Sequence, residues 1–458
     1  MGRSLVIILT ATAVCLATLL TITAADNPDA NASDKEAILD AAEIQSGLTL
    51  DDCIKVALEN NPDIAQKKWD IETSLAEKDI AKGQLWPSIS AEAGYVHYLD
   101  DQRLVPSRRP GEISTFTDDI FSGDIVLRMP FYTSGRFESQ VKASEYLAAS
   151  TKHQFARSRK ELVFNVSNVF YSILGQKEVV DSLVFSQKAL QEHRKRVQEL
   201  LDTQKAARVD LLRTEVRLAD IEQNILRERN ILYIQKSLLA NLMGVEHPLK
   251  PIEIQGRLEP KDFTVDTVQS FALASAQRSD FKAAKARVEA QDKNLDAAEA
   301  GHWPIVSLEA AYGNRWAAGS TAGGSSTSED IGRVGVIAEI PLFEGGRIDA
   351  RIRRERSRLS AEKEVLRKLQ LQIQLEVETA VSNIESTKAR VAAMEKAVEQ
   401  AKESLRIERE KYDLGKGAIV DVLDAQAALL EAQTSFYRAM ADYNVAIAQW
   451  RLAVGEEI

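Results

Sequence analysis

The sequence predicts a mainly helical α+β protein made of two structural repeats, each with two membrane β-strands and long coiled-coil helices. Three observations support this fold class. A pattern recurs after a little over 200 residues, long stretches of helix-forming residues lack proline, and short segments alternate apolar and polar residues. The formal net charge of −10 argues against nucleic acid as a partner.

Residues 1–25 have the layout of a secretory signal peptide. Arg3 is the only charged residue before Asp26, and the apolar stretch between them is too short to favour a membrane span. Small residues at Thr23 and Ala25 suit a cleavage site, and the polar segment 26–47 that follows disfavours a retained anchor. After cleavage only Cys53 would remain, so we expect no internal disulfide.

An internal duplication organises the rest of the chain. Trp86-Pro87 recurs as Trp303-Pro304, 217 residues later, whereas Pro130 recurs as Pro341, 211 residues later. The second spacing also relates Val209-Asp210-Leu211-Leu212 to Val420-Asp421-Val422-Leu423. A loop of variable length therefore lies between the two recurring segments of each copy. We expect repeat 1 at 48–246, a proline-containing linker at 247–262 and repeat 2 at 263–458.

Two long helices are predicted, at 135–202 and 346–413. Both segments lack proline and are rich in Ala, Glu, Lys, Arg, Leu and Gln. At ~1.5 Å per residue each helix would be roughly 100 Å long, too long for an ordinary globular domain.

Heptad spacing shows how the second of these helices is buried. Val377, Ile384, Val391, Val398 and Leu405 are seven residues apart, and a companion series begins at Ala380. This pattern predicts a coiled-coil seam with small residues that permit close helix approach. A cytoskeletal or scaffold coiled coil would show the same heptads.

Period-two alternation predicts two strand pairs, at about 86–132 and about 303–345. Each strand has an apolar face and a mostly polar face, as in a transmembrane β-strand, although a soluble antiparallel sheet would look similar. The residues that form the apolar faces are Ile89, Ala91, Ala93, Tyr95, Ile125, Leu127, Met129, Val306, Leu308, Ala310, Tyr312, Val336, Ala338 and Ile340. Aromatic residues at one end of the strands suit a membrane interface.

Four strands cannot close a membrane barrel, because barrels need about eight strands or more and lipid does not tolerate open edges. The chain must therefore oligomerise through its strands. Two chains would supply eight strands and three would supply twelve, and strand arithmetic leaves both open.

Residues 412–426 (Tyr-Asp-Leu-Gly-Lys-Gly-Ala-Ile-Val-Asp-Val-Leu-Asp-Ala-Gln) closely resemble the hairpin-tip motif of the TolC family. The resemblance extends over almost all of the chain after residue 25, including the duplication and the strand pairs. It implies a homotrimer whose twelve strands form one barrel in outer-membrane lipid, continued by a periplasmic α-helical barrel. It also implies a passive exit channel of a Gram-negative tripartite efflux or type I secretion system. Its partners would be a periplasmic adaptor (membrane fusion) protein and an inner-membrane pump of RND or ABC type.

The same resemblance assigns roles to residues of the motif. Asp421 and Asp424 match family carboxylates that ring the narrow periplasmic entrance, and Tyr412 with Asp210 match a latch between hairpins. For Asp421 the alternative is a cap at the start of the returning helix. The hairpin tips, where an adaptor would make contact, comprise Gly415, Lys416, Gly417, Arg208, Val209 and Val420. Gln204, which stands where repeat 2 has Gly415, departs from the repeat.

No catalytic function, cofactor or metal is expected. The five histidines show no ligand spacing, and neither a phosphate-binding glycine loop nor a nucleophile elbow is present. The basic run from Arg351 to Arg356 is compatible with contact to lipid head groups or with the barrel lumen, but a solvated helix face is the favoured interpretation. Long helical hairpins also occur in two other kinds of protein: a periplasmic adaptor, which would need lipoyl-like domains beside one hairpin, and a structural coiled coil, which would not need lipid-facing strands.

Overall fold

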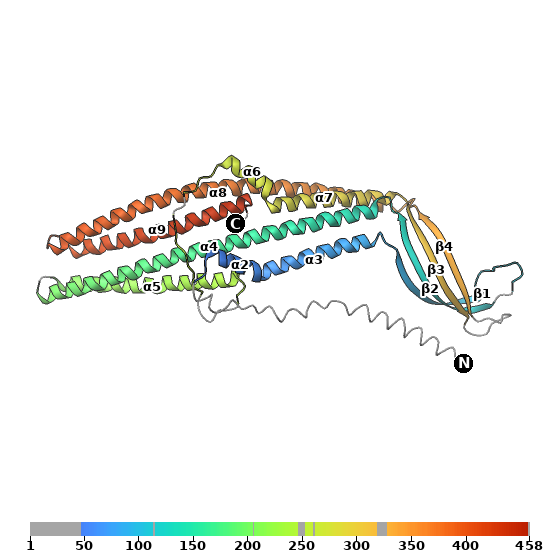
Figure 1. Cartoon of the computed structure of the whole chain (residues 1–458), viewed down its shortest axis with the longest axis horizontal. Coiled ribbons are helices and arrows are strands. Elements are labelled where there is room, and N and C mark those ends of the chain that lie inside the picture. Colours follow the sequence, from blue (N-terminus) through green and yellow to red (C-terminus); the bar gives the residue numbers. More distant parts are fainter. Residues whose placement is uncertain are drawn as a thin grey trace, which may run out of the picture.

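The computed structural model describes residues 47–112, 115–204, 206–245, 252–259, 262–317 and 328–456. The predicted signal peptide and nearly all of the polar segment after it lie outside these residues. The molecule is elongated, with a four-stranded sheet at one end and the tips of two helical hairpins at the other (Figure 1).

The sheet is antiparallel and has the strand order β1-β2-β3-β4. Its strands are β1 (Ser88–Arg103), β2 (Phe116–Tyr132), β3 (Ile305–Ala317) and β4 (Ser328–Glu339). The register pairs Ala91 with Ile125, and Ile125 with Tyr312, so the predicted apolar faces merge into one face across the sheet. This face is open to the surroundings in one chain, with Ile89 71% and Val336 69% exposed.

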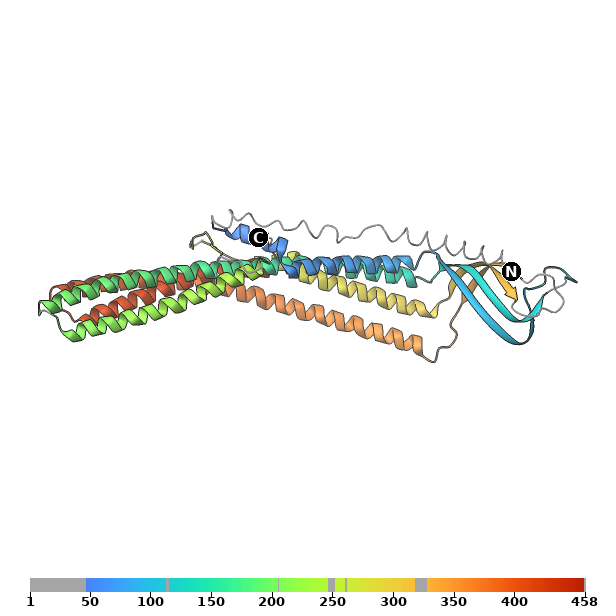
Figure 2. The ribbon, with the colours of Figure 1, turned by 90° about the horizontal axis from the view of Figure 1, so that it is seen from below.

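At the end of the sheet that faces the hairpin tips, each strand is connected to a helix, and these four helices lie in the same order as the strands. These helices are α3 (Pro62–Gly83), α4 (Arg136–Asp202), α7 (Ser279–Glu299) and α8 (Arg347–Asp413), and neighbours in this order are in contact. Figure 2 shows strands and helices as one curved layer. The passage from strand to long helix turns at Gly135 (φ 80°) and Gly346 (φ 79°), a left-handed conformation that glycine adopts without steric cost.

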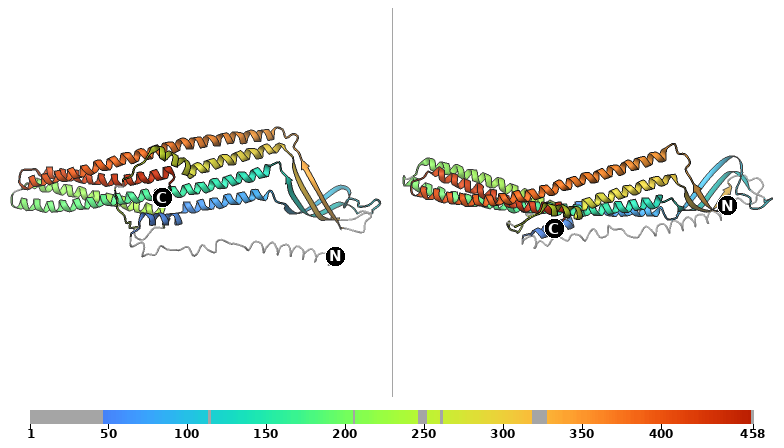
Figure 3. Two further views of the ribbon diagram at one scale, coloured as in Figure 1. Left: turned by 45° about the horizontal axis from the view of Figure 1, so that its top comes forward. Right: turned by 90° about the horizontal axis from the view of Figure 1, so that it is seen from above.

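The two long helices are confirmed, and each runs for 67 residues. At the far half of the molecule α4 pairs with α5 (Arg208–Leu242), and α8 pairs with α9 (Ile419–Val454). The heptad seam of α8 is buried as predicted: Ile384 and Val391 share a cluster with Met440 of α9, and Leu405 packs against Val422. The two hairpins lie side by side in both views of Figure 3.

A middle zone joins the two halves through α2 (Leu50–Asn60) and α6 (Thr267–Gln277), short helices that periodicity did not single out. Of the expected linker at 247–262, the structure describes residues 252–259 and 262. Ile252 and Ile254 are buried in the cluster that contains Cys53, and Leu48 forms a parallel bridge with Ile254. Burial of these two apolar side chains against α2 and α4 explains why the segment packs on the body.

None of the described helices combines the length and the apolar character needed to cross a membrane.

Candidate functional site

The tips of the two hairpins lie at the end of the molecule farthest from the sheet (Figure 1). Each tip turns through one residue with positive φ, Gln204 (58°) in the first and Gly415 (68°) in the second. The backbone NH groups of these residues donate to Leu201 O and Tyr412 O, both at 2.9 Å. The two tips therefore share one turn geometry, although glutamine pays a steric cost in the left-handed region that glycine does not.

Asp210 and Asp421 occupy equivalent positions in the third residue of α5 and α9. The carboxylate of Asp210 accepts from the NH of Ala207 at 3.3 Å, and that of Asp421 accepts from the NH of Ala418 at 3.3 Å. Each therefore caps its returning helix, where a negative charge also interacts favourably with the helix dipole. The capping role weighed for Asp421 is thus present within one chain, and it leaves the second carboxylate oxygen free of hydrogen bonds within the described chain.

Asp424 lies three residues after Asp421, so both carboxylates lie on adjacent turns of the same helix. Both side chains are exposed, whereas Val422 and Leu423 between them are buried against the hairpins. The sequence therefore directs two acids away from the hydrophobic contact at the very end of the molecule.

Tyr412 lies where the hairpins meet. Its ring packs beside the buried cluster that contains Val197 of α4 and Leu423 of α9, and its centroid is 5.7 Å from the ring of His193. Burial, followed by the nearby carboxylates of Asp210 and Asp413, raises the pKa of Tyr412. Within this chain the phenol and Asp210 are close enough to interact electrostatically but do not form a hydrogen bond, and the predicted latch stays a prediction.

An ion pair that the sequence analysis missed also bridges the hairpins. Arg196 Nη2 of α4 lies 3.3 Å from Asp413 Oδ1 of α8. His193 lies three residues earlier on α4, nearly one turn from Arg196, and its ring faces that of Tyr412. The repeat gave no signal for either residue, because the positions 211 residues later are Ser404 and Ile407.

The remaining tip residues form the outer surface of the turns. The residues with exposed side chains or backbone are Arg208, Val209, Gly415, Lys416 and Val420, and Gly417 is half-buried. A Cβ at position 417 would lie 3.1 Å from Lys411 Cβ and 3.2 Å from Tyr412 N. The tip thus has little room for a side chain at Gly417, which explains why glycine suits this turn.

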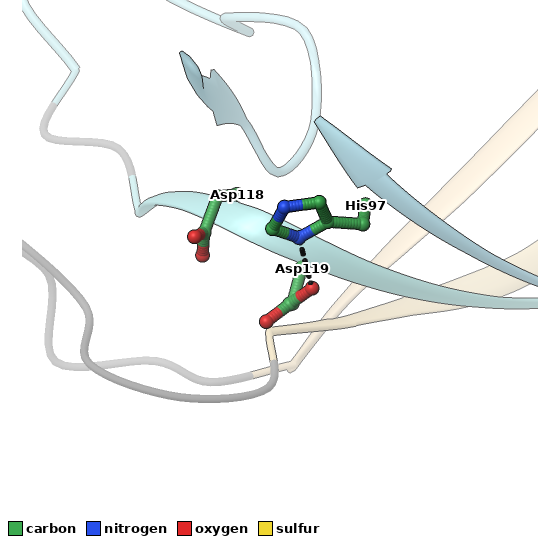
Figure 4. A group of neighbouring side chains, drawn as sticks. All are labelled: His97, Asp118 and Asp119. Atoms are coloured by element: carbon green, nitrogen blue, oxygen red, sulfur yellow. Dashed lines mark hydrogen bonds and ion pairs between the residues drawn. The ribbon is translucent and has the colours of Figure 1, made fainter. Parts of the chain in front are cut away.

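A separate group of titratable side chains lies at the outer end of the sheet (Figure 4). His97 Nδ1 lies 2.7 Å from Asp119 Oδ1, the same oxygen accepts from the Tyr95 hydroxyl at 2.6 Å, and Asp118 is close by. These contacts join β1 to β2 where their register becomes irregular. Since the Asp119 carboxylate is already hydrogen-bonded twice, we assign the group to strand pairing.

The basic run in α8 is partly paired. Arg354 and Arg358 both contact the buried carboxylate of Glu355, at 2.6 and 3.1 Å, and Gln291 of α7 donates to it at 2.9 Å. Burial would raise the pKa of Glu355, but these hydrogen bonds and charges lower it. Arg351 and Arg353 are exposed, as expected for a solvated face.

A curved layer of strands with one exposed apolar face, continued by coiled helices that end in exposed carboxylates, defines a class of protein: a subunit of a membrane-spanning conduit. Sequence comparison agrees. The profile described as "Outer membrane efflux protein" matches residues 53–245 and 271–456. The chain belongs to this outer membrane efflux protein family.

Individual relatives are distant but cover most of the chain. Outer membrane protein TolC of Vibrio cholerae is 22% identical over 81% of this chain and 83% of its own length. Proteases secretion protein PrtF of Dickeya chrysanthemi is 23% identical over 82% and 81%. The crystal structure of the Campylobacter jejuni CmeC outer membrane channel superposes with a TM-score of 0.76 at 17% identity, covering 89% of this chain and 85% of that one.

The protein is therefore an outer-membrane exit channel of a Gram-negative bacterium, and the expectations for family, fold class, function and location are confirmed.

Proposed function

We propose that the chain acts as a homotrimer that conducts substrates passively and is gated at the hairpin tips by Asp421 and Asp424. The single observation that carries this proposal is the placement of both exposed carboxylates in the first two turns of α9, the helix that begins at a hairpin tip opposite the sheet (Figure 1). Three copies would bring six carboxylates to one constriction, which would favour cations and disfavour anions.

The gate would be held closed by contacts between hairpins. Tyr412 and Asp210 supply a donor and an acceptor on different hairpins, and Arg196 with Asp413 adds an ion pair. No catalysis is proposed: the energy would come from an inner-membrane pump, of RND or ABC type, through a periplasmic adaptor. The secretion named for PrtF and the efflux named for the family support a place in such a system. The tip residues that would contact the adaptor are Arg208, Val209, Gly415, Lys416, Gly417 and Val420.

The test is planar-bilayer conductance of the purified protein and three variants: Asp421→Asn, Asp424→Asn and the double variant. Asparagine keeps an oxygen that can cap Ala418 NH, so these variants remove charge without removing the cap. We expect small cation-selective steps in the parent and a graded loss of cation selectivity in the variants. Unchanged selectivity in the double variant would contradict the gate and leave the channel intact.

A silent parent channel would be examined with Tyr412→Phe, which removes the phenol but keeps the packing of the ring. Conductance that appears in this variant would support the latch. Persistent silence of a correctly inserted trimer would overturn conduction through these tips.

Adaptor contact has its own test. A photo-crosslinking residue at Arg208 or Lys416 should capture a periplasmic protein that the same residue at exposed Leu371 of α8, far from the tips, does not.

A further inference from the structure

The polar face of the sheet carries a chain of alternating charges that crosses all four strands. Arg128 of β2 lies 3.0 Å from Glu92 of β1 and 3.5 Å from Glu309 of β3, and Arg333 of β4 lies 2.7 Å from Glu309. The register puts the four residues on the same side of the sheet, opposite the apolar face. We call Glu92, Arg128, Glu309 and Arg333 the charge ladder.

The two ends of the ladder differ from its middle. Glu309 lies between two arginines and its side chain is 18% exposed, whereas Glu92 and Arg333 each have one ladder partner and are 49% and 69% exposed. Both end residues lie on edge strands, Glu92 on β1 and Arg333 on β4, and within the described part of one chain no further strand pairs with the outer side of either. The ladder therefore ends in a carboxylate at one edge and a guanidinium at the other.

The charges of the two edge strands are complementary only when β1 of one copy lies beside β4 of another. Glu92 is the only carboxylate of β1 between Ser88 and Leu99, a stretch with neither lysine nor arginine. Arg333 is the only lysine or arginine of β4. A copy of this chain placed beside β1 therefore offers one cation to Glu92, and like charges cannot satisfy it.

The geometry within one chain also shows how such a contact would be made. Glu92 reaches Arg128 diagonally, since its register partner on β2 is Asp124, four residues away from Arg128. Arg128 faces Glu309 directly in the register, whereas Arg333 lies two residues along β4 from Gly335, the register partner of Glu309. Side chains of this length therefore pair across register offsets of zero to four residues, and a contact between two chains does not need Glu92 and Arg333 to be direct register partners.

We infer that Arg333 of one copy pairs with Glu92 of the next, and that the charge ladders of three copies close into a continuous ring on the inner wall of the barrel. This rests on the trimer proposed above and specifies the interface between its subunits. The ring holds six arginines and six glutamates, so it fixes the relative register of the subunits without adding net charge to the passage.

Cross-linking tests the contact directly. Cys15 and Cys53 are first replaced by alanine, and cysteines are placed at Glu92 and Arg333. A bis-maleimide shorter than the roughly 14 Å between β1 and β4, three strand spacings apart, cannot join the two sites within one chain. The control pair is Glu92→Cys with Val334→Cys, whose second thiol lies one residue along β4 on the apolar face.

We expect covalent dimers and trimers from the first pair, several-fold more than from the control. A native trimer that yields no more cross-link than the control would overturn the ring while leaving the channel function intact. A protein without any oligomer would overturn the trimer itself and the ring with it.

A charge cycle supplies the second readout, the temperature at which the trimer dissociates in detergent. It uses Glu92→Gln, Arg333→Gln and their combination in an Arg128→Gln background, in which the path along the ladder within one chain is interrupted. Because each change removes one partner of the same contact, the second change should lower the dissociation temperature very little once the first has been made. Fully additive losses would contradict a contact between Glu92 and Arg333.

Discussion

The imidazole of His193 on α4 packs against the phenol ring of Tyr412 on α8, with 5.7 Å between the ring centroids. The Nε2 atom of His193 is buried and has no hydrogen-bond partner among the described residues. Burial, and then the charge of Arg409, lowers the pKa of His193. One neutral imidazole thus lies at the seam between the hairpins, where a proton would be poorly accommodated.

From this contact we predict acid sensitivity of the hairpin packing. A histidine whose pKa is lowered by folding resists protonation in the folded state, so its contribution is complete above the unfolded pKa of about 6.5 and is lost as pH falls below it. The thermal midpoint of the parent should fall between about pH 7 and pH 5 more steeply than that of His193→Gln. Identical pH profiles would show that this histidine does not couple to stability.

The ion pair beside this contact should have a small effect. Arg196 and Asp413 are 59% and 45% exposed, so either alanine variant should lower the free energy of unfolding by no more than about 1 kcal/mol. The loss should shrink in high salt, because exposed pairs are screened. Urea unfolding would measure it, and the exchanged pair Arg196→Asp/Asp413→Arg should recover most of the loss. A loss that is independent of salt would argue for packing instead.

The first tip should become more stable when its turn residue is glycine. Gln204 has φ 58°, which costs a non-glycine residue about 1 kcal/mol or more. After the extra chain entropy of glycine is subtracted, Gln204→Gly should gain about 0.5 kcal/mol. The matched change in the other tip, Gly415→Ala, should lose about 1 kcal/mol in the same unfolding assay. A destabilising Gln204→Gly would mean that the glutamine side chain has contacts that offset the strain.

The middle zone should depend strongly on Arg278. Its side chain is 1% exposed and donates to Asp280 at 2.6 Å, to Glu376 at 2.6 Å and to Ala453 O at 3.2 Å. Arg278→Met would remove the hydrogen-bonded cation from two partly buried carboxylates, and it should lower the free energy of unfolding by about 3 kcal/mol or more. The same change at exposed Arg367 of α8 is the control and should stay within about 0.5 kcal/mol. Equal losses in the two variants would contradict a special role for the buried guanidinium.

The pKa of Asp280 allows a second check of the same network. Burial would raise it, but the hydrogen bond and charge of Arg278 lower it below its usual range. Stability from this carboxylate is therefore present above the unfolded pKa of about 3.9 and is lost as pH falls below that value. The acid limb of unfolding should be less steep in Asp280→Asn than in the parent, and an unchanged limb would show that the pair does not titrate with unfolding.

The sequence by itself determined the elements that depend on local pattern. Proline-free composition gave the two 67-residue helices, heptad spacing gave the burial of Ile384 and Val391, and alternation gave the four strands with one apolar face. The tip was indicated by the resemblance of residues 412–426 to the hairpin-tip motif of the family, and not by local pattern. The helices, the heptad seam and the strands depend on residues that are close together in the sequence, so they can be predicted without knowing which distant residues meet.

Only the tertiary structure decided which distant side chains meet. His193 lies beside Tyr412, Arg196 beside Asp413, and Arg128 between Glu92 and Glu309, although the members of these sets are tens to hundreds of residues apart in sequence. The sequence around a charged residue does not reveal its ion-pair partner, because the partner is set by strand register and helix pairing. The duplication predicted two copies of each strand pair and each long helix. It did not show that the four strands would form one sheet, in which the charges of the ladder lie next to one another.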